Sequence, residues 1–220
     1  MGLYGRYVVP RLINFAMQDK VVAAERARYV PLAAGNVLEI GAGSALNLPF
    51  YRREEVERLV ALEPSRELWE LGRERVAAAG FPVEFMPASA EAIPAPDRSF
   101  DTIVMTWTLC SIVRPAKALG ELARVLKPAG RLIFIEHGRA PEATVAAWQD
   151  RLNPLWRPIA GGCNMNRAID SLIAGNGFAI GELEAGYGGG PKMLTYLYRG
   201  IATLRPATQI PEHSVAQGSC

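Results

Sequence analysis

Short apolar segments recur along the chain, and each is followed by glycine or by polar residues. Five of these segments are predicted to be strands, at residues 36–40, 58–62, 83–86, 100–106 and 132–136. Strands this uniformly apolar are typical of a sheet that is covered on both of its faces.

Between the strands, apolar residues follow a helical spacing. Residues 11–29 are predicted to form one helix, because Leu12, Phe15 and Val22 lie on one side and Pro31 ends the pattern. Further helices are predicted at about 66–79, about 116–126 and about 167–174. The stretch after His137 shows no clear period and is expected to be irregular.

Strands that alternate with helices form βαβ units, so the predicted fold class is α/β with a parallel sheet. Two more strands are predicted at 178–184 and 194–199, and their short, glycine-rich connection makes them antiparallel. The sequence contains no internal repeat and no domain linker, so residues 1–205 are expected to form a single domain. Residues 206–220 are polar, include two prolines and are predicted to be a flexible tail.

The amino-acid composition excludes several classes of function. The 24 basic and 22 acidic residues give a net charge of +2 without any run of Lys or Arg, which argues against a dedicated nucleic-acid-binding protein. Residues 1–9 lack the apolar core of a signal peptide, and no apolar stretch reaches the roughly 18 residues that span a bilayer. Three separated cysteines and two histidines predict neither disulfides nor a zinc site, so we expect no metal and a cytoplasmic location.

A glycine turn and an acidic residue mark a ligand site. The first strand runs into Gly41-Ala42-Gly43, and the second strand ends at Glu63, twenty residues after Gly43. Such a turn lets a ligand lie against the backbone at the carboxyl end of the first strand. An acid at the tip of the second strand is placed to accept hydrogen bonds from both ribose hydroxyls of an adenosine. A glycine-rich turn without a ligand is the alternative.

The turn does not fit a dinucleotide. Leu46 stands where the dinucleotide fingerprint needs its third glycine, which disfavours a nicotinamide oxidoreductase, and no Walker lysine follows. Instead Glu39 precedes the first glycine by two residues. We expect Glu39 to organise the turn through backbone N–H groups and to lie near a cationic amino group, which suits a ligand that bears an amino acid.

Five segments resemble, in chain order, the motifs of class I S-adenosylmethionine-dependent methyltransferases: VLEIGAGSALN, VALEPS, ASAEAIP, SFDTIVMTWTLCSI and ARVLKPAGRLIFIEH. The resemblance implies a Rossmann-like, doubly wound seven-stranded sheet, mostly parallel with an antiparallel last strand pair, and S-adenosyl-L-methionine as cofactor. It implies that Gly41 and Gly43 contact the methionine part, Glu63 the ribose and Thr106 the sulfonium. It also implies that Ser89, Ala90 and Glu91 flank the adenine, and that Glu39, Ala42, Asn47 and Pro64 belong to the cofactor site.

Two positions depart from the family's pattern. Ala45 replaces the third glycine of the turn and is expected to fit there with a negative φ. Ser89 stands where many relatives carry an aspartate for the adenine amino group. Ser89 can still accept one hydrogen bond; otherwise the contact moves to Glu91 or to the backbone.

The sequence does not decide which molecule accepts the methyl group. Five short segments are similar to the group that methylates alkyl thiols: Leu109-Cys110-Ser111, Glu136-His137, Trp148-Gln149, Pro154-x-Trp156 and Gly162-Cys163. The NLPFY segment is similar to bacterial phospholipid N-methyltransferases. We expect direct in-line methyl transfer to a small, fairly apolar acceptor, with a thiol favoured. A phospholipid amine and a quinone ring carbon are the alternatives within the class, and a non-enzymatic S-adenosylmethionine-binding protein is the alternative outside it.

Positions after the strand tips give an acceptor-site hypothesis. Trp107 follows the fourth strand and His137 ends the fifth, while Trp148, Trp156 and Arg167 belong to residues 138–176, where this fold builds its acceptor site. We expect these residues to line a cleft that faces the methyl group, with His137 as the base. The alternative is that His137 only orients Glu136 or closes the pocket.

Two further expectations concern the surroundings of the site. Residues 1–34 are expected to form a helical lid. Its cations Arg6, Arg11 and Lys20 favour a solvated helix face, and a peripheral membrane contact is the alternative. Cys110 and Cys163 are expected to be small buried residues, since direct methyl transfer needs no covalent enzyme intermediate. The sequence is consistent with a monomer or a homodimer.

Overall fold

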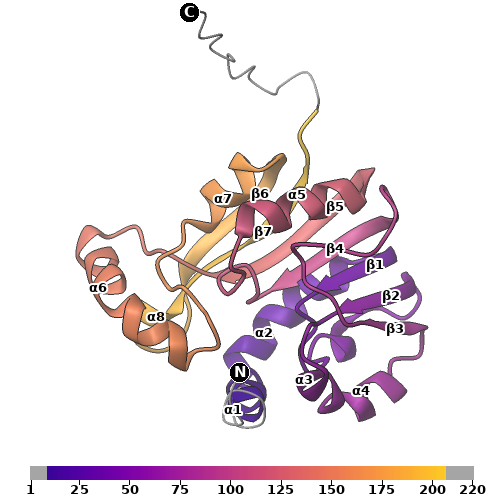
Figure 1. Ribbon diagram of the computed structural model, residues 1–220, viewed down its shortest axis with the longest axis horizontal. Helices are drawn as coiled ribbons and strands as arrows, with labels where there is room; N and C mark the ends of the chain where they lie inside the picture. The colour runs from indigo at the N-terminus through magenta and orange to yellow at the C-terminus, as the bar shows by residue number, and fades with distance from the viewer. Residues whose placement is uncertain (1–8, 207–220) are drawn as a thin grey trace, which may run out of the picture.

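A single sheet of seven strands organises the computed structural model, which describes residues 9–206. The strand order is β3-β2-β1-β4-β5-β7-β6 (Figure 1). The strands are β1 Gly35–Ile40, β2 Val56–Leu62, β3 Val83–Met86, β4 Phe100–Thr106, β5 Leu126–His137, β6 Phe178–Tyr187 and β7 Tyr196–Leu204. The first five pair in parallel, whereas β7 runs antiparallel to both β5 and β6. The predicted α/β sheet with an antiparallel last pair is therefore confirmed.

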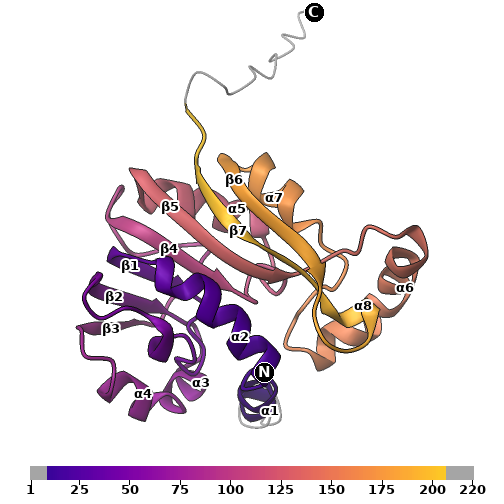
Figure 2. The same cartoon turned by 180° about the vertical axis from the view of Figure 1, so that it is seen from behind.

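Alternating side chains of the central strands fill two cores, one on each face of the sheet. Leu38 and Ile40 of β1 pack in the core beneath α5 (Pro115–Val125) and α7 (Ile169–Gly175), which lie on one face in Figure 1. Val37 points the other way, toward α2 (Lys20–Tyr29), which Figure 2 shows crossing the opposite face. This double coverage explains the runs of apolar residues in the central strands, such as Leu59–Leu62 and Leu132–Ile135.

The N-terminal helix is broken, which corrects the prediction of one helix over 11–29. The structure has α1 at Val9–Ala16 and α2 at Lys20–Tyr29, joined by a short turn. Asp19 has an extended backbone, and its carboxylate accepts a hydrogen bond from Val21 N at 2.8 Å. An aspartate that caps the next helix in this way competes with continuation of the first helix. A 3₁₀ turn, η2 (Val30–Leu32), follows α2.

The helix predicted at 66–79 is also two helices, α3 (Arg66–Glu70) and α4 (Arg73–Ala77). The break lies at Gly72, where an added β-carbon would come within 2.5 Å of Ser44 O. Gly72 is therefore the point at which these helices pack directly on the glycine turn after β1. The turn itself continues into a second 3₁₀ segment, η3 (Leu48–Phe50).

A 17-residue helix, α6 (Ala143–Ile159), occupies the stretch that was expected to be irregular. Pro154 and Pro158 lie inside it, and each removes one backbone donor from the helix. The helix nevertheless continues through both prolines. A short helix, α8 (Lys192–Thr195), also precedes β7, which starts two residues later than predicted.

Two expectations concern the ends of the chain and the membrane. Most of the predicted tail, from residue 207 onward, lies outside the described residues, as do residues 1–8 with Arg6. Between residues 9 and 206, the structure has no helix that is long and apolar enough to cross a membrane.

Candidate functional site

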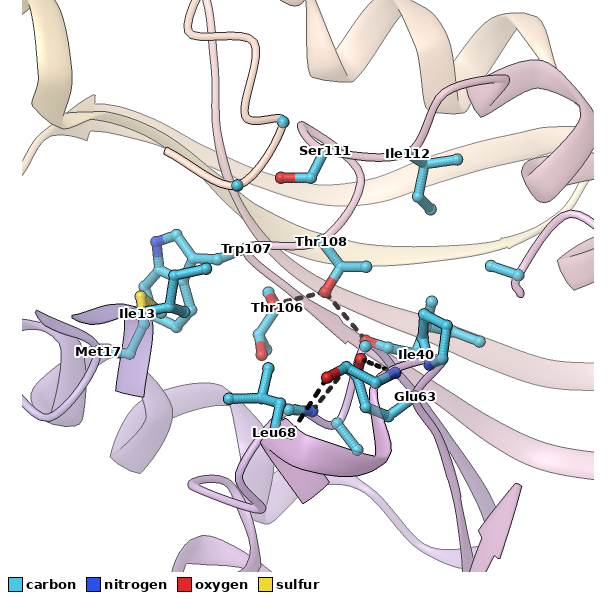
Figure 3. A pocket seen from close by; sticks show the side chains of 18 of the residues that line it. Ile13, Met17, Ile40, Glu63, Leu68, Thr106, Trp107, Thr108, Ser111 and Ile112 are labelled. Carbon is cyan, nitrogen blue, oxygen red and sulfur yellow. Dashed lines mark hydrogen bonds between the residues drawn. The ribbon is translucent and has the colours of Figure 1, made fainter. Parts of the chain in front are cut away.

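A large cavity opens at the carboxyl ends of β1, β2 and β4, with a volume of ≈ 1020 Å³. Figure 3 shows its lining, with Glu63 on one side and with Trp107, Ile13 and Met17 grouped on the other. The lining includes the whole predicted cofactor set: Glu39, Gly41, Ala42, Gly43, Asn47, Glu63, Pro64, Ser89, Ala90, Glu91 and Thr106. The topology therefore gathers residues from four separate sequence segments at one edge of the sheet.

The glycine turn is held by close backbone approaches. Gly41 has φ +65°, and an added β-carbon would lie 2.3 Å from Thr108 Oγ1, so only glycine fits. Gly43 has φ +55°, and an added β-carbon there would make an ordinary van der Waals contact with Leu68 at 3.6 Å. Ala45 has φ +60°, which corrects the expected negative value: this alanine adopts the left-handed conformation that its glycine counterpart would adopt without cost.

Glu63 joins the turn to the end of β2. One carboxylate oxygen accepts a hydrogen bond from Gly43 N at 3.1 Å, and the other accepts one from Ser65 N at 2.8 Å. Burial raises the pKa of Glu63, and these two backbone donors oppose that shift. Each oxygen keeps a further lone pair, so the carboxylate can still accept two hydroxyl donors from the cavity.

Glu39 is placed differently from expectation, because it binds side chains instead of the backbone of the turn. Its two oxygens accept hydrogen bonds from Asn47 Nδ2 at 3.0 Å and from the Tyr51 hydroxyl at 2.8 Å. Burial raises the pKa of Glu39 to about 7. The same Asn47 amide also donates to Thr106 Oγ1 at 3.0 Å, which connects Glu39 to the tip of β4.

Arg26 is a cavity residue that the sequence analysis missed. It reaches from α2 to Asn47, donating from Nε to Oδ1 at 2.8 Å, and its Nη1 donates to Met17 O at 2.7 Å. Its guanidinium also lies 5.0 Å from the ring centre of Trp107. Burial lowers the pKa of Arg26 to about 10, so the side chain stays charged at neutral pH. An isolated arginine in a helical pattern carries no signal that it points into a site.

The predicted adenine side is ordered by a salt bridge. Both Glu91 oxygens bind Arg114, at 2.6 Å from Nε and 3.0 Å from the backbone N. Ser89 Oγ accepts a hydrogen bond from Glu91 N at 3.2 Å. With the Glu91 carboxylate engaged, the backbone around Ser89 and Ala90 is the more available partner for an adenine amino group.

The structure does not bring the predicted acceptor residues together. Trp107 lines the cavity, whereas His137, Trp148, Trp156 and Arg167 are absent from its lining. Trp148 is 53% exposed on the outer side of α6, and Arg167 donates to Leu109 O. The missed helix α6 accounts for this difference, because a helix sends its two tryptophans to different sides.

His137 is buried behind the cavity wall. Only 6% of the residue is exposed, and its Nδ1 lies 3.5 Å from Cys163 Sγ. Burial lowers the pKa of His137 to about 4, so the imidazole is neutral across the physiological range. Its neighbour Glu136 is engaged by the backbone N–H groups of residues 108–110 and does not contact the cavity.

The rest of the cavity wall comes from α1 and α6. Ile13, Asn14 and Met17 close it from the N-terminal side, and Asn14 Oδ1 accepts a hydrogen bond from Ser44 Oγ at 2.6 Å. Pro154, Arg157 and Pro158 close it from α6, together with Ser111, Ile112 and Val113 after β4. These segments form the second half of the cavity, beyond the cofactor set.

The sheet, the glycine turn and the carboxylate at the end of β2 together form an arrangement that is typical of class I S-adenosylmethionine-dependent methyltransferases. Residues 38–134 match the family described as a methyltransferase domain, and this segment of the chain belongs to that family. The match begins in β1 and ends in β5. It therefore covers the cofactor half of the cavity and leaves out α1, α2 and α6.

Relatives of the chain act on different acceptors. A thiol S-methyltransferase of Rattus norvegicus is 36% identical over 151 residues, which are 67% of this chain and 62% of the relative. A demethylmenaquinone methyltransferase of Clavibacter sepedonicus is 35% identical over 59% of this chain and 51% of its own length. A phosphatidylethanolamine N-methyltransferase of Cereibacter sphaeroides is 30% identical over 57% of this chain and 62% of its own length. The chain thus spans only about half to three fifths of these relatives.

A solved structure shows the same fold over nearly the whole chain. The S-adenosylmethionine-dependent methyltransferase of Thermotoga maritima superposes with a TM-score of 0.63 at 20% identity, covering 92% of this chain and 98% of that one. This likeness supports the fold, including the antiparallel last pair, and leaves the acceptor undetermined.

The burial of His137 has a consequence for stability. The unfolded chain takes up a proton on this imidazole near pH 6.5, whereas the folded chain resists protonation until about pH 4. Stability that is present above pH 6.5 should therefore be lost as the pH falls through this window, by up to about 3 kcal/mol. Urea unfolding of wild type and His137→Leu at a series of pH values measures this. The difference in unfolding free energy should fall toward low pH; a difference that is constant with pH would contradict the burial of a neutral imidazole.

Proposed function

We propose that the protein transfers the methyl group of S-adenosyl-L-methionine to a small, apolar thiol by direct in-line displacement. The cofactor occupies the side of the cavity formed by the glycine turn and Glu63. The acceptor enters between α1, α6 and the loop after β4. Holding the sulfur in line with the methyl group supplies most of the acceleration in such a reaction, since effective molarities reach roughly 10⁵ M or more.

One observation carries the choice of a thiol, namely the charge of the acceptor half of the cavity. Among the described residues that line that half, Arg157 is a cation, and no carboxylate or imidazole lies there; the lining acids Glu39, Glu63 and Glu91 belong to the cofactor half. A thiol with a pKa of about 8.5 already provides a few per cent of thiolate at neutral pH without a base. A nearby guanidinium raises that fraction.

The same charge disfavours the main alternative. The amine of a phospholipid is a cation at neutral pH and must lose a proton before it can attack, and Arg157 would repel it. A quinone ring carbon needs deprotonation of a phenol with a pKa of about 10, for which the acceptor half offers no base. The relative that methylates thiols, at 36% identity, supports the thiol as well.

His137 has a different role in this proposal from that of a base. It lies behind the wall next to Cys163, which follows the cavity residues Gly161 and Gly162. We therefore assign it to positioning of this wall. Likewise, α1 within residues 1–34 is the proposed lid, because Ile13, Asn14 and Met17 cover the cavity.

The test is the rate of methyl transfer to alkyl thiols by wild type and by Arg157→Met, with cofactor saturating. Removal of the cation should lower turnover about tenfold near pH 7, equivalent to about one pKa unit of the thiol, and the loss should shrink near pH 9. Arg151→Met is the matched control, because Arg151 lies on the same helix outside the cavity lining. Turnover of a phospholipid amine or a quinol in preference to any thiol would overturn the proposal.

A further inference from the structure

Exposed apolar side chains gather on the elements that border the cavity mouth. Phe15 is 81% exposed on α1, Val113 is 71% exposed after β4, and Leu155 and Ile159 are 69% and 72% exposed on α6. With Leu12 of α1 they form a group that we call the apolar rim. Within residues 9–206, these five make up more than half of the exposed large apolar residues, and a gathering of this kind marks an interaction surface.

The rim continues along α6 as a regular stripe. Trp148, Leu152, Leu155 and Ile159 recur at intervals of three or four residues and therefore lie along one face of the helix. A neighbouring face is fixed by the fully buried Gln149, whose Nε2 donates to Gly138 O and Met193 O and whose Oε1 accepts from Ala140 N. These three hydrogen bonds set the rotation of α6, so the stripe is held outward.

The elements that carry the rim also line the acceptor half of the cavity. An added β-carbon on Gly161 would lie 2.8 Å from Ile13 Cδ1, so α1 meets the loop that follows α6. Figure 2 shows α1 and α6 projecting to the same side, beyond the sheet. Pro154 and Pro158 line the cavity, and the rim residues Leu155 and Ile159 follow them directly in the chain.

The charges on α6 are mainly positive. This helix carries Arg151 and Arg157 and a single acid, Asp150. Asp150 accepts a bidentate pair of hydrogen bonds from Arg139 at 2.7 and 2.9 Å, so its charge is already neutralised. A surface that combines exposed apolar residues with cations complements a bilayer whose headgroups are anionic.

We propose that the apolar rim docks on the surface of an anionic lipid bilayer and takes its acceptor from that surface. The inference rests on the proposed function only in that the acceptor is apolar and therefore concentrates in lipid. A second copy of the chain on the same rim would close the cavity mouth of both copies, whereas a bilayer delivers the acceptor to it. The docking is interfacial, with the side chains of α1 and α6 entering the headgroup region.

The experiment is sedimentation with vesicles of phosphatidylcholine mixed with phosphatidylglycerol. Wild type should bind, and the double variant Leu155→Ser with Ile159→Ser should bind at least about tenfold more weakly, because two exposed apolar side chains no longer enter the interface. Leu183→Ser is the matched control, since Leu183 is an equally apolar residue exposed on β6, away from the rim. Vesicles of pure phosphatidylcholine should bind wild type more weakly than the anionic mixture does.

Turnover separates this inference from the proposed function. With a short, water-soluble thiol the double variant should be as active as wild type, because neither changed residue lines the cavity. With a long-chain thiol dissolved in the vesicles it should be slower by about the factor lost in binding. Failure of wild type to bind anionic vesicles, equal binding by the double variant, or a wild-type dimer that the double variant dissociates would overturn the docking. Vesicle binding without methylation of any thiol would refute only the thiol assignment.

Discussion

Replacing Glu63 by alanine should weaken the binding of S-adenosylmethionine about 10- to 100-fold. The variant loses a charged acceptor for two ribose hydroxyls, and hydrogen bonds to charged groups contribute about 1.5–3 kcal/mol. It also leaves Gly43 N and Ser65 N without their carboxylate partner, so the turn that carries the methionine part loosens at the same time. Isothermal titration calorimetry with S-adenosylmethionine and with S-adenosylhomocysteine measures the loss.

Two controls make this result specific. Glu84→Ala removes an exposed acid from β3, at the edge of the same sheet, and should leave cofactor affinity unchanged. NAD should fail to bind to wild type, since Leu46 lines the cavity where a dinucleotide turn needs glycine. Unaltered affinity in Glu63→Ala would remove the ribose assignment.

Gly41→Ala should lower the free energy of unfolding by about 3 kcal/mol and abolish most cofactor binding. The left-handed φ of +65° costs an alanine about 1–2 kcal/mol. The new methyl group would also displace Thr108, whose hydroxyl donates to Ile40 O and Thr106 O, and such overpacking costs about 1–3 kcal/mol. Thermal melting should show a midpoint about 10 °C lower.

The same substitution at another glycine should have the opposite sign. Gly120 lies in α5 with nothing within 4 Å of an added β-carbon. Gly120→Ala should therefore stabilise the protein by up to about 1 kcal/mol, through helix propensity alone. If both variants melt alike, the tight fit at Gly41 is not what holds the turn.

The sheet and the cofactor side could be predicted because their signals are local. The glycine turn directly follows an apolar strand, and the acid directly follows the next one, so each can be recognised from its sequence neighbours. The βαβ rule then brings the two strand ends to one edge of the sheet. Glu63 and Gly43 are an example, since their spacing of twenty residues became a hydrogen bond of 3.1 Å.

The acceptor side could not be predicted because its signals are not local. The stretch after His137 was expected to be irregular, and the packing of Gln149 explains which way the helix found there faces. Arg26 belongs to the site because the chain turns at Asp19. The turn places Met17 O where it accepts a hydrogen bond from the Arg26 guanidinium. His137 stands at the expected strand end, but it contacts Cys163 from the loop after α6 and does not line the cavity.

The hydrogen bonds of Arg26 couple any movement of the N-terminal helix to the residues of the predicted cofactor site. Arg26 holds Met17 O at the end of α1 and Asn47 beneath the methionine side, while Asn14 holds Ser44 in the glycine turn. Any outward swing of α1 must break the contacts at Met17 and Ser44 together. We therefore expect exchange of the spent cofactor for a fresh one to require the opening of this helix, a step of the catalytic cycle that lies far from the chemistry.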